Sequence, residues 1–227
     1  MKYLIVNGDD LGASRGINRG ILEAQRCGIL TSTSLLVNAA ESEKAAELSR
    51  TLPEMSVGLH ADLRNELKAT TDPHRLREVL CAQIARFEEL MGRPPTHLDA
   101  HHNVHRDPRA LPCFLDVARE YGFPLREHSP VRYFSKFYGR WAGESHLEQI
   151  SAESLARMLE TKIKEGITEL SCHPGYVDPN YSTGYAAERE RELRTLCDPL
   201  IRRVLVEQSI QLVSYRDLAK LLVSAPV

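Results

Sequence analysis

Short apolar runs alternate with longer amphipathic segments along the whole chain. The short runs are typical of buried β-strands, whereas the longer segments repeat apolar residues every three or four positions, as the buried face of a helix does. The predicted strands are Tyr3–Asn7, Ser34–Asn38, Val57–His60, His97–His101, a weak strand at Leu125–Glu127, Glu169–His173 and Gln211–Ser214.

The predicted helices lie between these strands and carry capping signals at their ends. Ser14, Asp72 and Ser151 precede three of them, as residues that cap the first turn do. Gly92 and Gly122 follow two of them, where a glycine commonly ends a helix. The expected helices run from Ser14 to before Gly28, over Pro73–Met91 and Pro108–Tyr121, from Ser151 to before Gly166, and over Ala186–Gln208.

Alternation of strands and helices predicts an α/β fold with a mostly parallel sheet and right-handed crossovers. The chain has 227 residues and no internal repeat or interdomain linker, so we expect a single domain over residues 1–227. About seven strands in a domain of this size favour a TIM-barrel-like (β/α) barrel closed by seven or eight strands. An open, doubly wound sheet is the alternative fold.

Composition narrows the class of protein further. Hydrophobic residues make up 42% of the chain, as in ordinary globular proteins. The net charge is −2, whereas proteins that bind nucleic acid or anionic membranes carry an excess of basic residues, so the charge argues against both classes. No apolar segment reaches the length of a membrane span, and the run Tyr3–Val6 is too short for a signal peptide. The five cysteines are odd in number and widely spaced, as in proteins with reduced thiols. We therefore expect a cytoplasmic protein.

Acidic and imidazole side chains gather at the ends of four predicted strands. Asp9 and Asp10 follow the first strand, and His60, His101 and His173 end three others. Each has an ordinary explanation when taken alone, since Asp10 could cap a helix and His60 could be a core histidine. Parallel α/β folds build their active sites at the carboxyl ends of strands, so the coincidence favours one shared site.

The fourth predicted strand carries the most concentrated signal. His97, Asp99 and His101 point to the same face because side chains alternate along a strand. Three buried ionisable groups are costly unless they are paired or bind a metal, and His105 can return to the same place from the loop. A divalent ion with open coordination positions explains this pattern. His102 points the other way and is expected to be structural.

At these residues the sequence resembles the YdjC/ChbG family of carbohydrate deacetylases. The resemblance covers most of the chain and depends on an opening DD-x-G, a G-L-H and an H-x-D-x-H-H-x-x-H in that order. The matching stretches are YLIVNGDDLGASRGINRGILEA, GILTSTSLLVN, VGLHADL, GRPPTHLDAHHNVH, ELSCHPGYVD and SYRDL.

The resemblance implies a TIM-barrel-like fold, one divalent ion (Mg²⁺ or Zn²⁺) and removal of an acetyl group from an N-acetylated sugar. The substrate implied is a small carbohydrate, a chitooligosaccharide such as diacetylchitobiose. By matching motif positions, Asp10, His60 and His101 would be metal ligands. Asp9 would be the general base. His105 and His173 would be catalytic or supporting groups near the acetyl carbonyl, with roles that could be exchanged.

The expected mechanism is attack of an activated water on the amide carbonyl, with Asp9 taking a proton from the water. His173 would stay protonated and give its proton to the departing amine. Asp99 is the expected acceptor from an imidazole N–H of a metal ligand. One departure from the family concerns Arg64–Thr71, a short segment where many relatives carry a long insertion over the sugar, so the cover of the site is expected to be shortened.

Three other functions fit parts of the pattern. A phosphoesterase or an amidohydrolase acting on a non-sugar amide could use the same scaffold, although phosphoesterases usually need a second ion. A sugar isomerase or epimerase would release no acetate. A non-catalytic sugar-binding relative would have lost the base or a ligand, whereas here every motif position is filled. A homodimer is expected only by analogy with other barrels.

Overall fold

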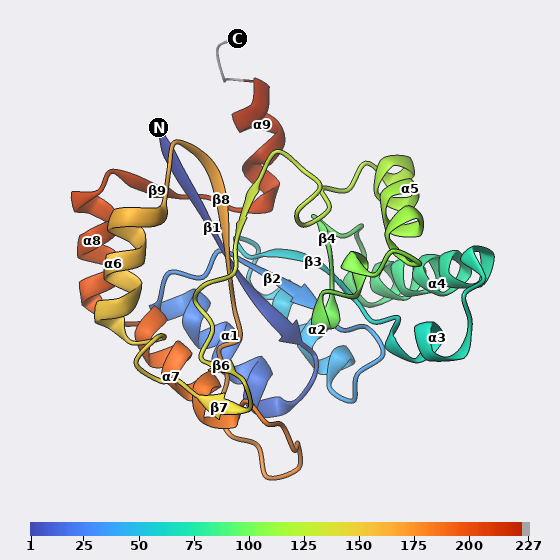
Figure 1. The fold of residues 1–227 in the computed structure, drawn as a ribbon, viewed down its shortest axis with the longest axis horizontal. Coiled ribbons are helices and arrows are strands. Elements are labelled where there is room, and N and C mark those ends of the chain that lie inside the picture. Colours follow the sequence, from blue (N-terminus) through green and yellow to red (C-terminus); the bar gives the residue numbers. More distant parts are fainter. Residues whose placement is uncertain (224–227) are drawn as a thin grey trace.

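A curled sheet of parallel strands forms the centre of the computed structural model, which describes residues 1–223 (Figure 1). The seven strands of this sheet are β1 Lys2–Leu11, β2 Ser32–Leu35, β3 Ser56–Ala61, β4 Leu98–Ala100, β5 Arg132–Phe134, β8 Gly166–Cys172 and β9 Ile210–Leu212. All of their pairings are parallel, as the alternation of strands and helices predicts.

The order of the strands is that of a barrel rather than of a doubly wound sheet. Neighbours follow the order β4-β3-β2-β1-β8-β5, and β9 pairs with the first residues of β1. Leu125 adds a single bridge to Leu98 in β4, which is all that forms of the weak strand predicted at Leu125–Glu127. Among the described residues no strand pairing joins Leu125 to β5. The sheet is therefore a half-barrel, and closure into a complete barrel stays a prediction.

Helices surround the outside of this sheet (Figure 1). They are α1 Arg15–Cys27, α2 Ser42–Arg50, α3 Arg64–Ala69, α4 Pro73–Met91, α5 Leu111–Tyr121, α6 Ala152–Lys162, α7 Ala186–Leu196, α8 Pro199–Glu207 and α9 Leu218–Val223. A short hairpin, β6 Arg140–Trp141 and β7 Glu144–Ser145, lies outside the main sheet. No helix within residues 1–223 is long and apolar enough to cross a membrane.

The capping signals read from the sequence are confirmed. The side chains of Ser14, Asp72 and Ser151 each accept a hydrogen bond from the backbone of the first turn that follows. Gly92 and Gly122 end α4 and α5 with positive φ angles of 68° and 72°, a conformation that glycine adopts without strain. Because Ser14 caps α1, the interpretation of the acidic pair before it as a helix cap is wrong.

The predicted helix Ala186–Gln208 is two helices. Pro199 lacks a backbone N–H and cannot continue the hydrogen-bond ladder of α7, so the chain restarts there as α8. Asp198 caps this second helix through the N–H of Leu200. The apolar periodicity continues across this break, so the pattern of apolar residues predicts one uninterrupted helix.

Several element boundaries also differ from the prediction. The strand expected at Ser34–Asn38 lies at Ser32–Leu35, because the polar Thr33 side chain is buried and donates to the backbone oxygen of Gly8 at 2.5 Å. α5 begins at Leu111 rather than at Pro108. The short helices α2 and α3 and the strand β5 were not predicted.

Candidate metal centre and substrate cavity

The predicted polar residues meet at the carboxyl ends of the strands. Asp9 and Asp10 lie near the end of β1, and His60 lies near the end of β3. His101 directly follows β4, and His173 directly follows β8. Four segments that are distant in the sequence therefore contribute to one site, as the strand-end pattern predicted.

A bulge in β1 turns two adjacent carboxylates toward the same interior. Neighbouring residues of a regular strand point to opposite faces. Asp10, however, has a left-handed φ of 72°, and the pairing of β1 with β2 shifts register between Gly8 and Leu11. As a result Asp9 and Asp10 are both buried, and each has a carboxylate oxygen near His60.

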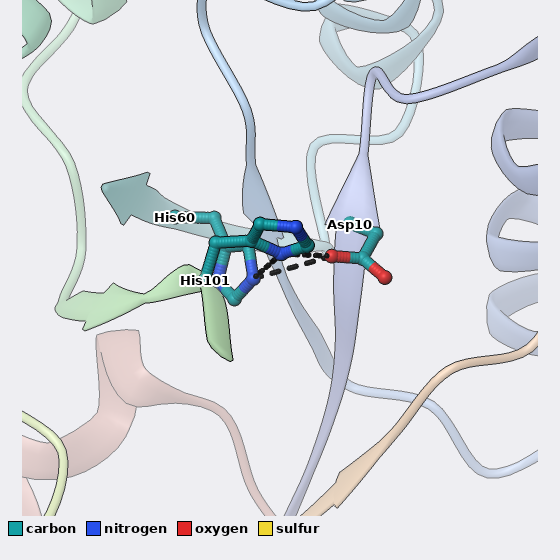
Figure 2. A group of neighbouring side chains, drawn as sticks. All are labelled: Asp10, His60 and His101. Carbon is teal, nitrogen blue, oxygen red and sulfur yellow. Dashed lines mark hydrogen bonds and ion pairs between the residues drawn. The ribbon is translucent and has the colours of Figure 1, made fainter. Parts of the chain in front are cut away.

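Asp10, His60 and His101 form a compact group of possible metal ligands (Figure 2). Asp10 Oδ1 lies 2.9 Å from His101 Nδ1 and 3.3 Å from His60 Nε2. The two imidazole nitrogens are 3.3 Å apart. Two ligands of a tetrahedral zinc ion at about 2.0–2.1 Å lie about 3.3 Å from each other, so the triangle has the size that such an ion requires.

The hydrogen bonding of these atoms also fits a cation. Asp10 Oδ1 is buried and receives no well-formed hydrogen bond from the described residues, although two ring nitrogens lie close to it. On the far side of the His60 ring, Nδ1 lies 2.7 Å from Asp99 Oδ1. This contact fixes the tautomer that leaves Nε2 free as a ligand, which is the common arrangement behind metal-binding histidines. Asp99 therefore lies where the sequence analysis expected it.

Without an ion, the pKa values of His60 and Asp10 are shifted strongly from their ordinary values. Burial alone would lower the pKa of His60, but Asp99 and Asp10 raise it to about 10. Burial alone would raise the pKa of Asp10, but Arg189, His101 and His60 hold it well below its ordinary value. Arg189 on α7 contacts the second carboxylate oxygen of Asp10 at 2.5 Å, so Oδ1 alone faces the two rings.

A second group, Asp9, His60 and Asp99, has similar ligand spacing but already holds a cationic side chain. The buried guanidinium of Arg126 binds both oxygens of Asp9, each at 2.8 Å. It also lies 2.7 Å from Asp99. A metal ion at this second position would be repelled by the guanidinium at close range. The geometry thus favours the Asp10 group as the metal centre.

Arg126 is the main functional residue that the sequence analysis missed. Its side chain is 1% exposed and also binds Glu169 of β8, with the closest contact at 2.6 Å. The only indication of its role in the sequence is that it is a charged residue within a predicted strand, Leu125–Glu127. Arginine is the side chain best suited to hold several buried carboxylates because its donors form a planar fork. The acids on the strand interiors required such a cation.

His97 belongs to the interior of the half-barrel and not to the metal centre. Its ring stacks on Tyr215 at 3.9 Å and covers Gly58, where a Cβ atom would come within 2.4 Å of the ring. Burial lowers the pKa of His97 to about 4, although Asp99 acts in the opposite direction. The ring is therefore a neutral packing group, and the glycine of the G-L-H motif makes room for it.

The structure does not bring His105 to the cavity, which corrects the expectation that it returns to the site. His102 and Asn103 have left-handed φ angles of 54° and 53°, and they turn the chain into a short 3₁₀ segment. The His105 ring is fully buried, contacts Glu127 at 3.0 Å and packs near Phe114. His102, expected to be structural, is instead exposed and lines the cavity.

His173 faces the metal centre from the opposite side. Its Nε2 lies 3.9 Å from Asp9 Oδ2, and its other ring nitrogen, Nδ1, is buried without a hydrogen-bond partner among the described residues. Burial lowers the pKa of His173 to about 4, although Asp9 and Asp10 act in the opposite direction. The lowered pKa favours a neutral ring in the resting site, whereas a ring that stays protonated was expected, and that expectation stays a prediction.

Glu192 lies behind His173 and was also missed from the sequence. Its carboxylate accepts a hydrogen bond from the backbone N–H of His173 and another from Tyr185 at 2.6 Å, and Oε1 lies 4.0 Å from His173 Nδ1. Burial raises the pKa of Glu192 to about 8. Glu188, Arg189 and Glu192 lie in the highly charged run AERERELRTL, which carries no local signal for burial, yet all three are buried.

A cavity of about 730 Å³ opens over these residues. Its floor contains Asp9, Asp10, His60, His101 and His173. Its walls carry hydroxyl and aromatic side chains. They come from β5 and the loop that follows it, namely Tyr133, Ser135 and Tyr138, and from the loop before α7, the run Tyr181 to Tyr185. Flat rings and short polar groups are the surfaces that bind a sugar well. A larger groove of about 880 Å³ lies between α1 and α2, and its lining contains no histidine.

Comparisons with known proteins agree with this geometry. The family model of the YdjC-like proteins matches residues 3–207. The carbohydrate deacetylase of Geobacillus stearothermophilus is 33% identical over 97% of this chain and 99% of its own length. The chitooligosaccharide deacetylase of Yersinia pestis is 32% identical over 95% of this chain and 99% of its own length.

Solved structures show the same fold. An Enterococcus faecalis V583 protein named for cellobiose-phosphate cleavage is 26% identical, with a TM-score of 0.80 over 96% of this chain and 98% of its own. A family 4 acetyl xylan esterase from Clostridium thermocellum, solved with a cobalt ion, has a TM-score of 0.60 at 14% identity, covering 99% of this chain and 93% of its own.

Proposed function

The chain belongs to the YdjC-like family, and from this premise we propose that it is a metal-dependent deacetylase of N-acetylated sugars, with a chitooligosaccharide such as diacetylchitobiose as substrate. The observation that carries the proposal is the triangle of Asp10, His60 and His101 on the floor of a cavity walled by hydroxyl and aromatic groups. A closed TIM-like barrel remains the proposed full architecture around this half-barrel.

Asp10, His60 and His101 would hold one divalent ion, Mg²⁺ or Zn²⁺. Two imidazole nitrogens and one carboxylate oxygen suit zinc better than magnesium, which prefers oxygen ligands. When bound there, such a cation supplies Lewis-acid polarisation of an amide carbonyl and makes water more acidic.

Asp9 is suited to act as the general base. Burial by itself would raise its pKa, but Arg126 lowers it below the ordinary value, so the carboxylate is charged at neutral pH. The two contacts from Arg126 and one from the Asn7 amide, at 2.8 Å, hold the carboxylate in one orientation. Fixed orientation and charge are what a residue needs to accept the proton of an attacking water.

His173 is suited to pass that proton to the leaving amine. Since its ring is neutral at rest, it can accept a proton from Asp9, 3.9 Å away, once Asp9 has taken it from water. The charged ring then donates to the amine nitrogen as the C–N bond breaks. The Glu192 carboxyl group, near the other ring nitrogen, would accept a hydrogen bond from the charged ring during this step. His105 has no part in the proposal.

The direct test of the function is an acetate-release assay. Purified protein is incubated with N-acetylglucosamine, diacetylchitobiose and the triacetylated trisaccharide, each with zinc, magnesium or a chelator. We expect metal-dependent release of acetate and a matching gain of free amine. Binding of these sugars without any acetate would favour a sugar-binding relative, and release of phosphate from phosphate esters would favour the phosphoesterase alternative.

Replacement of His101 tests the metal centre. His101→Ala is expected to abolish stoichiometric zinc in the purified protein, because it leaves only one imidazole and one carboxylate at the triangle. Elemental analysis gives the metal content. His102→Ala is the matched control, since this neighbour lines the cavity outside the triangle and should leave the metal content unchanged. Full zinc occupancy in His101→Ala would mean that the ligands are different.

Metal binding is expected to depend on pH in a defined direction. The pKa of His60 is about 10 without an ion, so an ion that binds at neutral pH must displace about one proton from the ring. Zinc affinity should therefore rise about tenfold per pH unit from pH 6.5 to 8.5. Titration calorimetry in buffers of different ionisation enthalpy measures the protons released, and binding without proton release would contradict this protonation state.

A further inference from the structure

A second cavity, of about 330 Å³, adjoins the substrate cavity at the metal centre. The two cavities share a wall formed by His60, Arg64, His101 and Tyr181. Two of the three proposed metal ligands therefore face both spaces. A group attached to an atom at the metal centre could extend into either cavity.

The lining of the second cavity is mainly apolar. The apolar side chains come from the end of β1 and the turn after β2, and they are Ala13, Leu36, Val37, Ala39 and Ala40. Among the polar side chains in the same wall, Gln83, Asp62 and Arg64 already have hydrogen-bond partners, whereas Asn38 is exposed. Gln83 pairs with the backbone of Asp62 at 2.8 and 2.9 Å, and the Asp62 carboxylate binds Arg64 at 2.7 Å. Sugar hydroxyls would thus find few free partners here, whereas an aliphatic chain would be well accommodated.

The volume of this cavity exceeds what an acetyl group needs. One water molecule occupies about 30 Å³ in the liquid, and the methyl of an acetyl group is of comparable size. The methyl would therefore fill only a small part of the 330 Å³. The space has room for several additional methylene groups in line with the methyl.

We propose that this second cavity, bounded by Ala13, Leu36, Val37 and Ala39 and contiguous with the metal centre, is an acyl pocket that lets the protein hydrolyse N-acyl amino sugars with chains longer than acetyl, such as butyryl. The inference rests on the proposed deacetylase function and extends its substrate class. The sugar lies in the cavity with hydroxyl and aromatic walls, the amide carbonyl lies at the metal centre, and the acyl chain enters the apolar cavity.

The reaction is the same amide hydrolysis with a longer acyl group. The water oxygen forms a bond to the carbonyl carbon, the C–N bond breaks, and the proton taken from water goes to the amine. The products are a short fatty-acid anion and the free amino sugar, and no further reactant is needed. Each methylene that the pocket buries is expected to favour the bound state by about fourfold.

The test compares diacetylchitobiose with its dibutyryl analogue on the zinc-loaded full chain. The expected ratio of kcat/KM, butyryl over acetyl, is one or more. Ala39→Leu should lower this ratio at least about tenfold, because the larger side chain at this half-exposed position occupies the pocket. Ala40→Leu, at an exposed position of the same pocket, should also lower the butyryl-to-acetyl ratio. This second variant is measured if Ala39→Leu folds poorly.

The matched control is Ala85→Leu on the exposed face of α4, outside both cavities, which should leave the ratio at its original value. Binding of butyrate and acetate, measured by calorimetry, gives a readout without turnover, and butyrate is expected to bind at least tenfold more tightly. Acetyl hydrolysis with a butyryl rate lower by 100-fold or more would overturn the acyl pocket and leave the deacetylase function standing. No release from either substrate would contradict both.

Discussion

Asp9→Asn is expected to lower kcat for acetate release by at least about 10², with little change in metal content. Asparagine has nearly the same shape and still accepts one hydrogen bond from Arg126, but its amide cannot accept a proton from water. The zinc ligands remain because Asp9 lies outside the triangle of Asp10, His60 and His101. Steady-state kinetics on diacetylchitobiose and elemental analysis of the same preparation measure the two effects.

The matched control is Asp107→Asn, a surface carboxylate that pairs with Arg109 at 2.6 Å. This substitution should leave kcat within twofold of the original protein. If Asp9→Asn retained near-normal turnover, another group would have to be the base. If it lost zinc together with activity, Asp9 would be a ligand instead.

Arg126→Met is expected to cost about 3–5 kcal/mol of unfolding free energy, because it leaves buried carboxylates without their cation. Asp9, Asp99 and Glu169 all contact this guanidinium within 2.9 Å, and all are almost completely buried. A loss of this size is a large part of the stability of an ordinary domain. Urea unfolding at pH 7 measures it.

A pH series distinguishes lost charge pairing from lost packing. In the original protein, Arg126 lowers the pKa of Asp9, so the stabilisation from this pair is present above the unfolded pKa near 4 and is lost as pH falls. In Arg126→Met the guanidinium no longer offsets burial, which raises the pKa of Asp9, so this carboxyl takes up a proton as pH falls from 7 toward 4 and part of the loss is relieved. The stability gap between the variant and the original protein should therefore narrow over this range and narrow further below pH 4. A gap that is independent of pH would point to packing alone.

Two further arginine variants provide reference values for the loss of unfolding free energy. Arg119→Met removes an exposed arginine whose contact with Asp116 is 3.5 Å long, and it should cost at most about 1 kcal/mol. Arg126→Lys keeps the positive charge but loses the forked donors of the guanidinium, so we expect an intermediate loss of unfolding free energy. This variant replaces Arg126→Met in the measurement if Arg126→Met does not fold.

The sequence predicted what local patterns encode. Apolar periodicity located the alternation of strands and helices, and single residues such as Ser14 and Gly122 marked helix ends correctly. The strand-end rule places Asp10, His60 and His101 at one edge of the sheet from the sequence alone, and the structure brings these three side chains together. These features depend on neighbours in the chain or on a general property of parallel sheets, so they can be predicted from a single sequence.

The missed features depend on partners that are far away in the chain. Arg126 gains its role from Asp9, 117 residues earlier, and from Glu169, 43 residues later. Glu192 is buried because Tyr185 and the backbone of His173 bind it, which no charge pattern within α7 reveals. The cytoplasmic location and the homodimer stay predictions.

The left-handed backbone of Asp10 limits how the ion preference of this centre could be re-engineered. At φ 72°, aspartate, asparagine and glycine are tolerated, whereas bulky or β-branched side chains are strained. A glutamate or a β-branched residue introduced there would be strained at the bulge that points the side chain inward. Selection for softer or larger cations is therefore expected to accumulate substitutions at His60 and His101, while the aspartate stays fixed.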